Sequence, residues 1–312
     1  MTQMKNSTIL LSIFILLLSA CSGGDKKAGE EGDQKLRVTT TTMMIHDAVQ
    51  VIGGEQVISE SLMGPGVDPH LYKATQGDLR KLSDADVILY NGLYLEGKLG
   101  EVFKKLERRK PVYAVAEEAL KPEKLLSSPV YQDAFDPHVW FDVSMWKQVV
   151  ARVGEVLANE DPTHAPIYKE RTANYLAELD DLHTWVKEQI ASIPEQQRIL
   201  VTAHDAFHYF GRAYDIKVHG LQGISTITEP GLKDVTELTQ LITANSIKAV
   251  FVETSVSEKM IQAVVEGCED KGHKVVIGGY LYSDAMGERG TPAATYKGMV
   301  HANVKTIVSS LK

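Results

Sequence analysis

Short apolar runs rich in β-branched residues alternate along this chain with longer amphipathic segments. That alternation is typical of βα units built around mainly parallel sheets. Eight runs are expected to form strands: Leu36–Thr42, Gln56–Met63, Val87–Asn91, Pro111–Val115, Arg198–His204, Lys217–Ser225, Ala249–Glu253 and Lys274–Gly279. They fall four and four in the two halves, so the pattern predicts an α/β protein with two (β/α)4-like lobes.

One long amphipathic segment separates the halves. It starts at Asp161-Pro162-Thr163 and contains no proline or glycine after Pro166. One apolar stripe is predicted from the positions Ile167, Tyr175, Leu179, Leu182 and Val186. A helix of about 28 residues would be ~40 Å long and would join the lobes rigidly. We therefore expect an N-terminal lobe over 36–160, a connecting helix over 161–192 and a C-terminal lobe over 193–312.

The first twenty residues have the order of a secretory signal peptide. Lys5 precedes the apolar run Ile9–Leu18, which is too short to span a hydrocarbon core of ~30 Å. The next residues, Leu18-Ser19-Ala20-Cys21, resemble a bacterial lipobox. We expect cleavage at residue 20 and lipidation of Cys21, the alternative being an ordinary small residue near a cleavage site.

Residues 21–35 are polar, glycine-rich and charged, and are expected to form a flexible tether with a reach of about 20 Å. The other cysteine, Cys268, is predicted to be a free buried thiol, so a disulfide framework is excluded. The formal net charge of −8 argues against a nucleic-acid partner, which requires a basic surface. We expect a monomer.

Of the ten histidines, six stand in contexts that favour packing or surface roles: His46, His164, His183, His219, His273 and His301. Two others, His70 and His138, each end an Asp-Pro-His turn, in which the proline fixes the backbone. The preceding Asp68 and Asp136 are either plain turn residues or acceptors for an imidazole N–H.

His204 ends a predicted strand, and Asp284 follows the last strand, where open α/β sheets bind ligands. His208 lies four residues after His204, as in a zinc-binding H-E-x-x-H helix, but Asp205 replaces the glutamate and the strand interrupts the helix. We expect His208 to pack or to support the site. Three imidazoles and one carboxylate would fill a tetrahedral shell around one metal ion between the lobes, or a five-coordinate shell if the carboxylate is bidentate.

The chain resembles the metal-binding solute-binding lipoproteins of zinc and manganese ABC importers (cluster A-I type). The resemblance covers the mature chain and is carried by GVDPHLY, DPHVWFD, TAHDAFHYF, Ser225…Glu229-Pro230-Gly231, FVET around Glu253, and LYSDAMG. It implies two lobes joined by one long helix and a permease with its ATPase as partners. It also implies one ion per chain, with the ligands His70, His138, His204 and Asp284. Supporting candidates are Asp68, Asp136, His208 and Glu253.

The predicted metal is zinc, with manganese second and ferrous iron third. Zinc members of this family often carry a histidine-rich loop, whereas residues 121–135 contain no histidine. Manganese members commonly use two histidines and two carboxylates, whereas the third position here is His204. Nitrogen ligands and the Irving–Williams order favour zinc over manganese.

Two other function classes are compatible with parts of this pattern. A zinc-dependent hydrolase would need an open coordination position and a general base, for which Asp205 and Glu253 are the candidates. A surface adhesin would share the fold and the anchor. Four protein ligands favour metal carriage over catalysis, so we expect no enzyme. We expect high-affinity capture outside the cytoplasmic membrane, in the periplasm or at the cell surface. Small tilting of one lobe or a local rearrangement of a ligand loop would then allow delivery to the permease.

Overall fold

The computed structural model describes residues 35–127 and 134–312. The predicted signal peptide, Cys21 and nearly all of the predicted tether lie outside the described residues. The chain divides into two compact units, residues 1–35 and 36–312, and the following description concerns the second. Among the described residues, no helix combines the length and hydropathy needed to cross a membrane.

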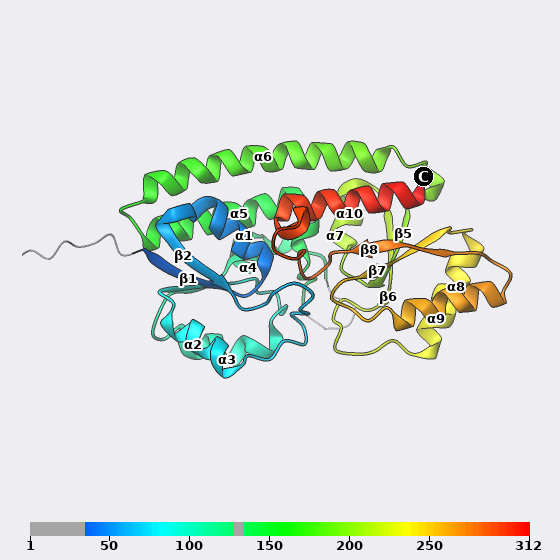
Figure 1. The fold of residues 1–312 in the computed structure, drawn as a ribbon, viewed down its shortest axis with the longest axis horizontal. Coiled ribbons are helices and arrows are strands. Elements are labelled where there is room, and N and C mark those ends of the chain that lie inside the picture. The colour runs from blue at the N-terminus through cyan, green and yellow to red at the C-terminus, as the bar shows by residue number, and fades with distance from the viewer. Residues whose placement is uncertain (1–34, 128–133) are drawn as a thin grey trace, which may run out of the picture. The chain divides into compact units, whose positions relative to one another are not determined.

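The first lobe is built on a four-stranded parallel sheet in the order β2-β1-β3-β4 (Figure 1). Its strands are β1 (Leu36–Thr40), β2 (Val57–Ser61), β3 (Val87–Tyr90) and β4 (Val112–Ala114). Its helices are α1 (Met43–Gly53), α2 (Gln76–Asp84), α3 (Gly100–Leu106) and α4 (Val115–Ala119). Because the strands are parallel, their carboxyl ends and the loops that follow them share one edge of the sheet.

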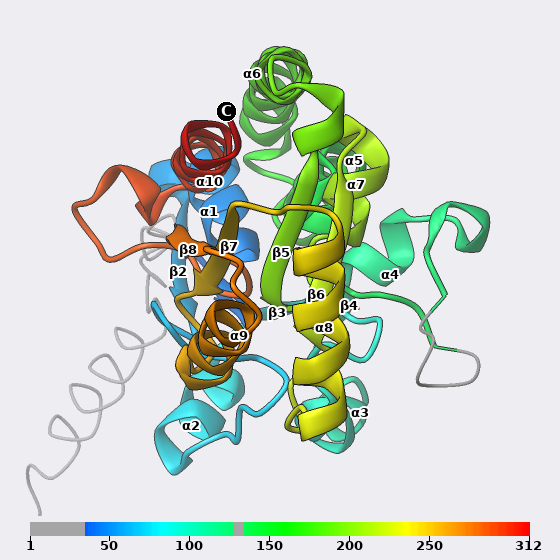
Figure 2. The ribbon, with the colours of Figure 1, turned by 90° about the vertical axis from the view of Figure 1, so that its right-hand side faces the viewer.

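The second lobe contains two separate parallel pairs, β5-β6 and β7-β8, in place of one four-stranded sheet. The strands are β5 (Ile199–His204), β6 (Lys217–Gln222), β7 (Ala249–Glu253) and β8 (Val276–Leu281). The helices are α7 (His208–Tyr214), α8 (Leu232–Ala244), α9 (Lys259–Asp270) and α10 (Tyr296–Leu311). Figure 2 shows α8 and α9 on the outer face of this lobe.

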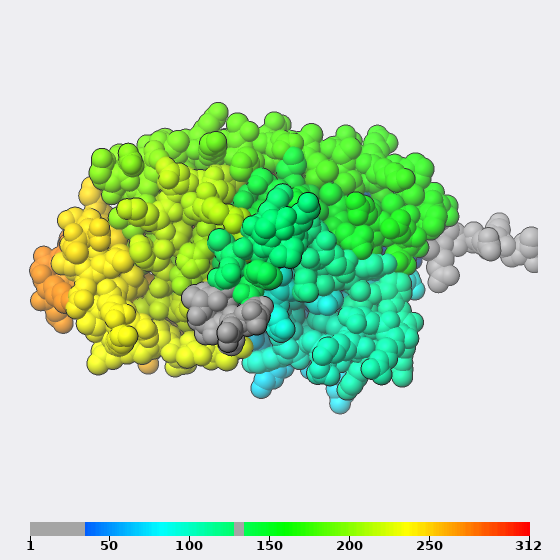
Figure 3. Space-filling view, turned by 180° about the vertical axis from the view of Figure 1, so that it is seen from behind, coloured from blue at the N-terminus to red at the C-terminus, as the bar shows by residue number. Residues whose placement is uncertain are grey.

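The long helix α5 (Val143–Glu160) packs on α1 and α4 of the first lobe, and the still longer α6 (Ala165–Ala191) packs on α5 and leads into the second lobe. The space-filling view from behind shows α6 running along both lobes (Figure 3). Its buried stripe consists of Tyr168, Tyr175, Leu179, Leu182, Val186 and Ile190. The predicted first member, Ile167, is only half-buried, because the spacing of the other positions puts Tyr168 on the inner face.

The largest hydrophobic cluster contains residues of both lobes, and each lobe has a smaller cluster of its own. The largest cluster includes Val38 of β1 and Leu200 of β5, together with residues from α5, α6 and α10. Helix α10 lies alongside α6 (Figure 1) and also contacts α1 of the first lobe. The lobes are therefore joined by packed side chains as well as by the connecting helix, and the predicted boundaries at residues 160 and 193 stay a prediction.

Candidate metal centre

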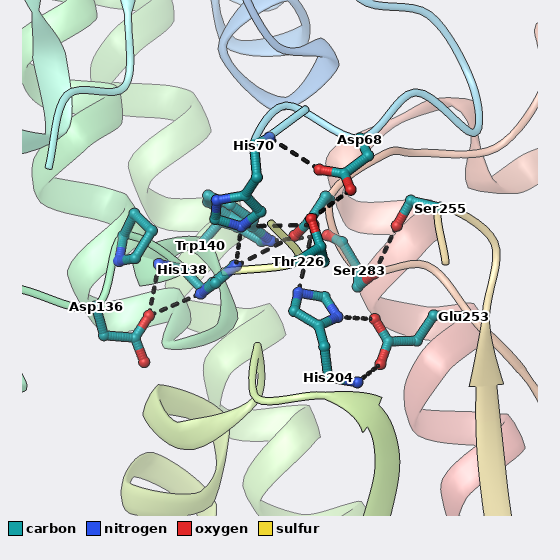
Figure 4. Close-up of polar contacts among 12 residues, drawn as sticks. Asp68, His70, Asp136, His138, Trp140, His204, Thr226, Glu253, Ser255 and Ser283 are labelled. Atoms are coloured by element: carbon teal, nitrogen blue, oxygen red, sulfur yellow. Dashed lines mark hydrogen bonds and ion pairs between the residues drawn. The ribbon is translucent and has the colours of Figure 1, made fainter. Parts of the chain in front are cut away.

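Four side chains from four separate segments meet between the lobes (Figure 4). His70 lies in the loop after β2, His138 precedes the short helix Val139–Phe141, His204 ends β5, and Asp284 follows β8. Their exposed fractions are 4%, 0%, 0% and 3%. One potential ligand atom from each lies within 4.8 Å of the others. The structure thus brings together all four residues that the sequence singled out.

The donor atoms are spaced as a small cation requires. Nε2 of His70 lies 3.2 Å from Nε2 of His138 and 3.9 Å from Oδ2 of Asp284. The Nε2 atoms of His138 and His204 each lie 3.3 Å from a carboxylate oxygen of Asp284. Ligands bound tetrahedrally at about 2.0 Å from one zinc ion are roughly 3.3 Å apart. The residues therefore fit a single ion of this size.

The two oxygens of Asp284 are buried and accept no hydrogen bond from any described residue. A buried polar atom in this state carries a desolvation cost unless a ligand or ion satisfies it. The neighbouring imidazoles point their Nε2 atoms at these oxygens at a distance longer than an ordinary hydrogen bond. Such an arrangement is typical of a cation site.

Two carboxylates orient two of the imidazoles. Asp136 Oδ1 lies 2.7 Å from Nδ1 of His138 and also accepts the backbone N–H of that histidine. Glu253 has the same relation to His204, since Oε2 lies 2.5 Å from Nδ1 and Oε1 accepts the backbone N–H. In both cases the partner on Nδ1 leaves Nε2 facing the centre of the site (Figure 4).

The other two supporting candidates are placed differently. Asp68 accepts the backbone N–H of His70 at 2.8 Å, which makes it a turn residue for that histidine and not a partner of its ring. His208 lies at the start of α7, with Nδ1 3.7 Å from Asp136 Oδ2 and Nε2 3.6 Å from Asp205 Oδ1. These separations exceed hydrogen-bond distance, so His208 contributes a weak polar contact behind Asp136.

Burial and charge act on the histidines in opposite directions. Burial lowers the pKa of His70 to about 3, against the attraction of Asp284. Burial also disfavours the charged form of His138, but the Asp136 carboxylate outweighs it and raises the pKa to about 9. The pKa of His204 is raised well above its usual value because the charges of Glu253 and Asp284 outweigh the effect of burial.

Burial opposes ionisation of Asp284, but the neighbouring His204 and His138 hold its pKa well below the usual value. The site therefore keeps buried negative charge, which a divalent cation can offset after displacing imidazole protons. The chemistry of this donor set is cation binding.

Three polar contacts around the site carried no signal in the sequence. The indole N–H of Trp140 donates to the carbonyl of Ser283 at 3.0 Å. The hydroxyl of Tyr209 donates to the carbonyl of Asp136 at 2.9 Å. The hydroxyl of Thr226 donates to Asp68 at 2.5 Å. Each joins segments far apart in sequence, so only the folded structure reveals it.

The chain matches, over residues 38–310, the family described as zinc-uptake complex component A, periplasmic. It is 50% identical over 312 residues to the manganese-binding lipoprotein MntA of Bacillus subtilis, with all of both chains covered. It is 46% identical over 288 residues to the zinc-binding protein TroA of Treponema pallidum, covering 92% of each.

Solved structures agree with these sequence relatives. The periplasmic zinc-binding protein TroA from Treponema pallidum superimposes with a TM-score of 0.87 at 46% identity, covering 89% of this chain and 99% of that one. The Fe(III)-bound YtgA from Chlamydia trachomatis superimposes with a TM-score of 0.80 at 26% identity, covering 89% and 98%. This chain therefore belongs to the ZnuA family, the periplasmic component A of zinc-uptake complexes.

Proposed function

We propose that the protein captures one divalent transition-metal ion at His70, His138, His204 and Asp284 and delivers it to the permease and ATPase of an ABC importer. Family membership makes the chain a metal-binding substrate-binding protein for manganese or zinc. The observation that carries the proposal for these four residues is the convergence of their buried donor atoms within 4.8 Å.

Zinc is the proposed cargo, with manganese the second candidate and ferrous iron the third. Three imidazole nitrogens and one carboxylate favour zinc over manganese, and TroA is named for zinc. Manganese is kept as a candidate because MntA, which is 50% identical, is named for that metal. Iron is kept because YtgA was solved with iron, in that structure as ferric Fe(III) and not as the ferrous ion proposed here.

The site supports carriage and not hydrolysis. Both oxygens of Glu253 are engaged by His204, and Asp205 accepts the backbone N–H of Gly220 at 2.7 Å. Glu253 is thus occupied in orienting His204, and four protein ligands would leave no open position of the kind that catalytic zinc needs. The alternative role as a surface adhesin would not involve the four residues of this site.

The proposed location is outside the cytoplasmic membrane, held by a lipid on Cys21. Several relatives are named lipoproteins, among them MntA of Bacillus subtilis and the metal ABC transporter substrate-binding lipoprotein SloC of Streptococcus mutans. Replacing Cys21 with serine is expected to move the protein from the membrane fraction to the soluble fraction. Retention of the variant at the membrane would contradict lipidation at Cys21.

The test of metal capture uses the mature chain from residue 22, purified without chelator. We expect one equivalent of zinc or manganese by elemental analysis, and zinc should displace manganese in competition. His70→Ala and Asp284→Ala should each weaken zinc binding by at least about 100-fold, because each removes a ligand. His301→Ala, which removes an imidazole that packs edge-on against Trp185, is the matched control. Unchanged affinity in the two ligand variants would refute the assignment.

A further inference from the structure

The loop that carries His138 is bonded firmly to the second lobe. The indole N–H of Trp140, two residues after His138, donates to the carbonyl of Ser283, next to Asp284. On the other side, the hydroxyl of Tyr209 on α7 donates to the carbonyl of Asp136. Both hydrogen bonds are buried. His138 is therefore fixed relative to the two potential ligands of the second lobe.

The loop that carries His70 has fewer hydrogen bonds to the second lobe. The hydroxyl of Thr226, in the loop between β6 and α8, donates to Oδ2 of Asp68 at 2.5 Å. The other oxygen of Asp68 accepts the backbone N–H of His70 at 2.8 Å. Contacts of the His70 ring aside, the bond from Thr226 is the only hydrogen bond among the described residues that joins a side chain of the second lobe to residues 64–72.

Thr226 is itself tied to the strands that position His204. The side-chain amide of Gln222, the last residue of β6, donates to the carbonyls of Thr226 and Thr228 at 2.8 and 2.7 Å. Gln222 pairs with His204 in the register of β5 and β6. One chain of backbone pairing and hydrogen bonds therefore links His204 to His70 through Gln222, Thr226 and Asp68. Figure 4 shows its last part, from Thr226 through Asp68 to His70.

We propose that Thr226 is a positioning residue for His70, and that breaking its hydrogen bond to Asp68 lets the His70 loop leave the other three ligands. This inference rests on the proposed metal-binding function and deepens it. His70 is then the ligand that opens the site, while His138, His204 and Asp284 stay together. The packed core that joins the lobes is consistent with this, because moving one loop leaves that core intact.

Loss of the hydrogen bond between Thr226 and Asp68 should increase the rate at which the ion dissociates. A hydrogen bond to a carboxylate stabilises the closed loop enough to alter exchange on the order of 10- to 100-fold. Thr226→Val removes the hydroxyl and keeps the shape, so we expect zinc to dissociate faster by that factor. Thr226→Ser keeps the hydroxyl and should restore the native rate. Thr228→Val is the matched control, because Thr228 is exposed and only its carbonyl is bonded to Gln222.

Dissociation is measured by stopped flow on the zinc-loaded mature chain, with excess chromophoric chelator. The stoichiometry of Thr226→Val should stay at one ion per chain. A rate for Thr226→Val within twofold of the native rate, or equal to that of Thr226→Ser, would overturn the proposal. Absence of stoichiometric zinc or manganese in the unaltered chain would instead refute the proposed function.

A second measurement separates positioning from a general structural effect. If Thr226 acts through His70, the Thr226→Val substitution should change the dissociation rate by less than twofold in a His70→Ala background. A further acceleration as large as in the native background would mean that the hydroxyl stabilises the site by another route. That result would also overturn the proposal.

Discussion

At both Asp-Pro-His turns the aspartate accepts the backbone N–H of the histidine two residues on, but only Asp136 also contacts the imidazole. The same three-residue sequence thus supports two different functions. Asp136 orients the ring of His138 and raises its pKa to about 9, whereas Asp68 directs its second oxygen to Thr226. The difference arises from what lies opposite each turn.

The raised pKa of His138 gives a pH dependence with a definite sign. With a pKa of about 9, its imidazole is protonated at pH 7 in the metal-free site, and the ion must displace that proton from Nε2. Zinc affinity should therefore increase as pH rises from 6 to 8, by about tenfold per pH unit for each proton released. Chelator competition at several pH values measures the slope.

Asp136→Asn provides the control for that slope. The substitution removes the charge that raises the pKa of His138, so the rise of affinity with pH should become shallower. Affinity near neutral pH should fall by about 10- to 100-fold, because the ring loses its charged partner. A pH-independent affinity in the unaltered chain would contradict the proposed proton displacement.

At the scale of elements, the eight predicted strands occur where the alternating pattern placed them, but most are shorter. The run Leu36–Thr42 ends as a strand at Thr40, and Lys217–Ser225 ends at Gln222. Apolar and β-branched residues continue past the last ladder hydrogen bond, so composition alone does not mark the end. Division of the second lobe into two pairs depends on long-range pairing, which no local pattern encodes.

The packing of α5 on α6 offers a test at this scale. A Cβ atom at Gly154 of α5 would lie 2.2 Å from Oγ1 of Thr172 on α6. Alanine is the better helix former by about 1 kcal/mol, but overpacking of this kind costs about 1–3 kcal/mol. Gly154→Ala should therefore lower the free energy of unfolding by about 1 kcal/mol in urea titrations.

Thr172→Ala supplies the second corner of a double-mutant cycle. In that background the space opposite Gly154 is free, so Gly154→Ala should be neutral or stabilising by up to about 1 kcal/mol. An equal loss of stability in both backgrounds would show that the contact with Thr172 is not what destabilises Gly154→Ala.

At the scale of the whole described unit, the largest hydrophobic cluster joins the lobes and includes residues of α5, α6 and α10. A protein held in this way should unfold as one cooperative unit. Because the four proposed ligands come from both lobes and converge only in the folded state, metal binding should stabilise the entire unit and not one lobe.

Calorimetry of metal-free and zinc-loaded protein tests this expectation. At free zinc 100 times the dissociation constant, binding adds about 2.7 kcal/mol, which corresponds to an increase in Tm of about 5–10 °C for a unit of this size. Excess chelator should reverse the shift. Two transitions, of which only one moves with zinc, would indicate that the lobes unfold independently.

The sequence by itself determined the α/β class, the strand positions, the long helix and the four residues that converge. These depend on local periodicity and on turns whose prolines restrict the backbone, so short stretches of sequence suffice. Assignment of those four residues as metal ligands stays a prediction. Only the tertiary structure decided which carboxylate faces each histidine, that one hydrophobic cluster unites the lobes, and that Thr226 lies opposite Asp68. Those contacts join residues separated by up to 158 positions, and no local pattern specifies them.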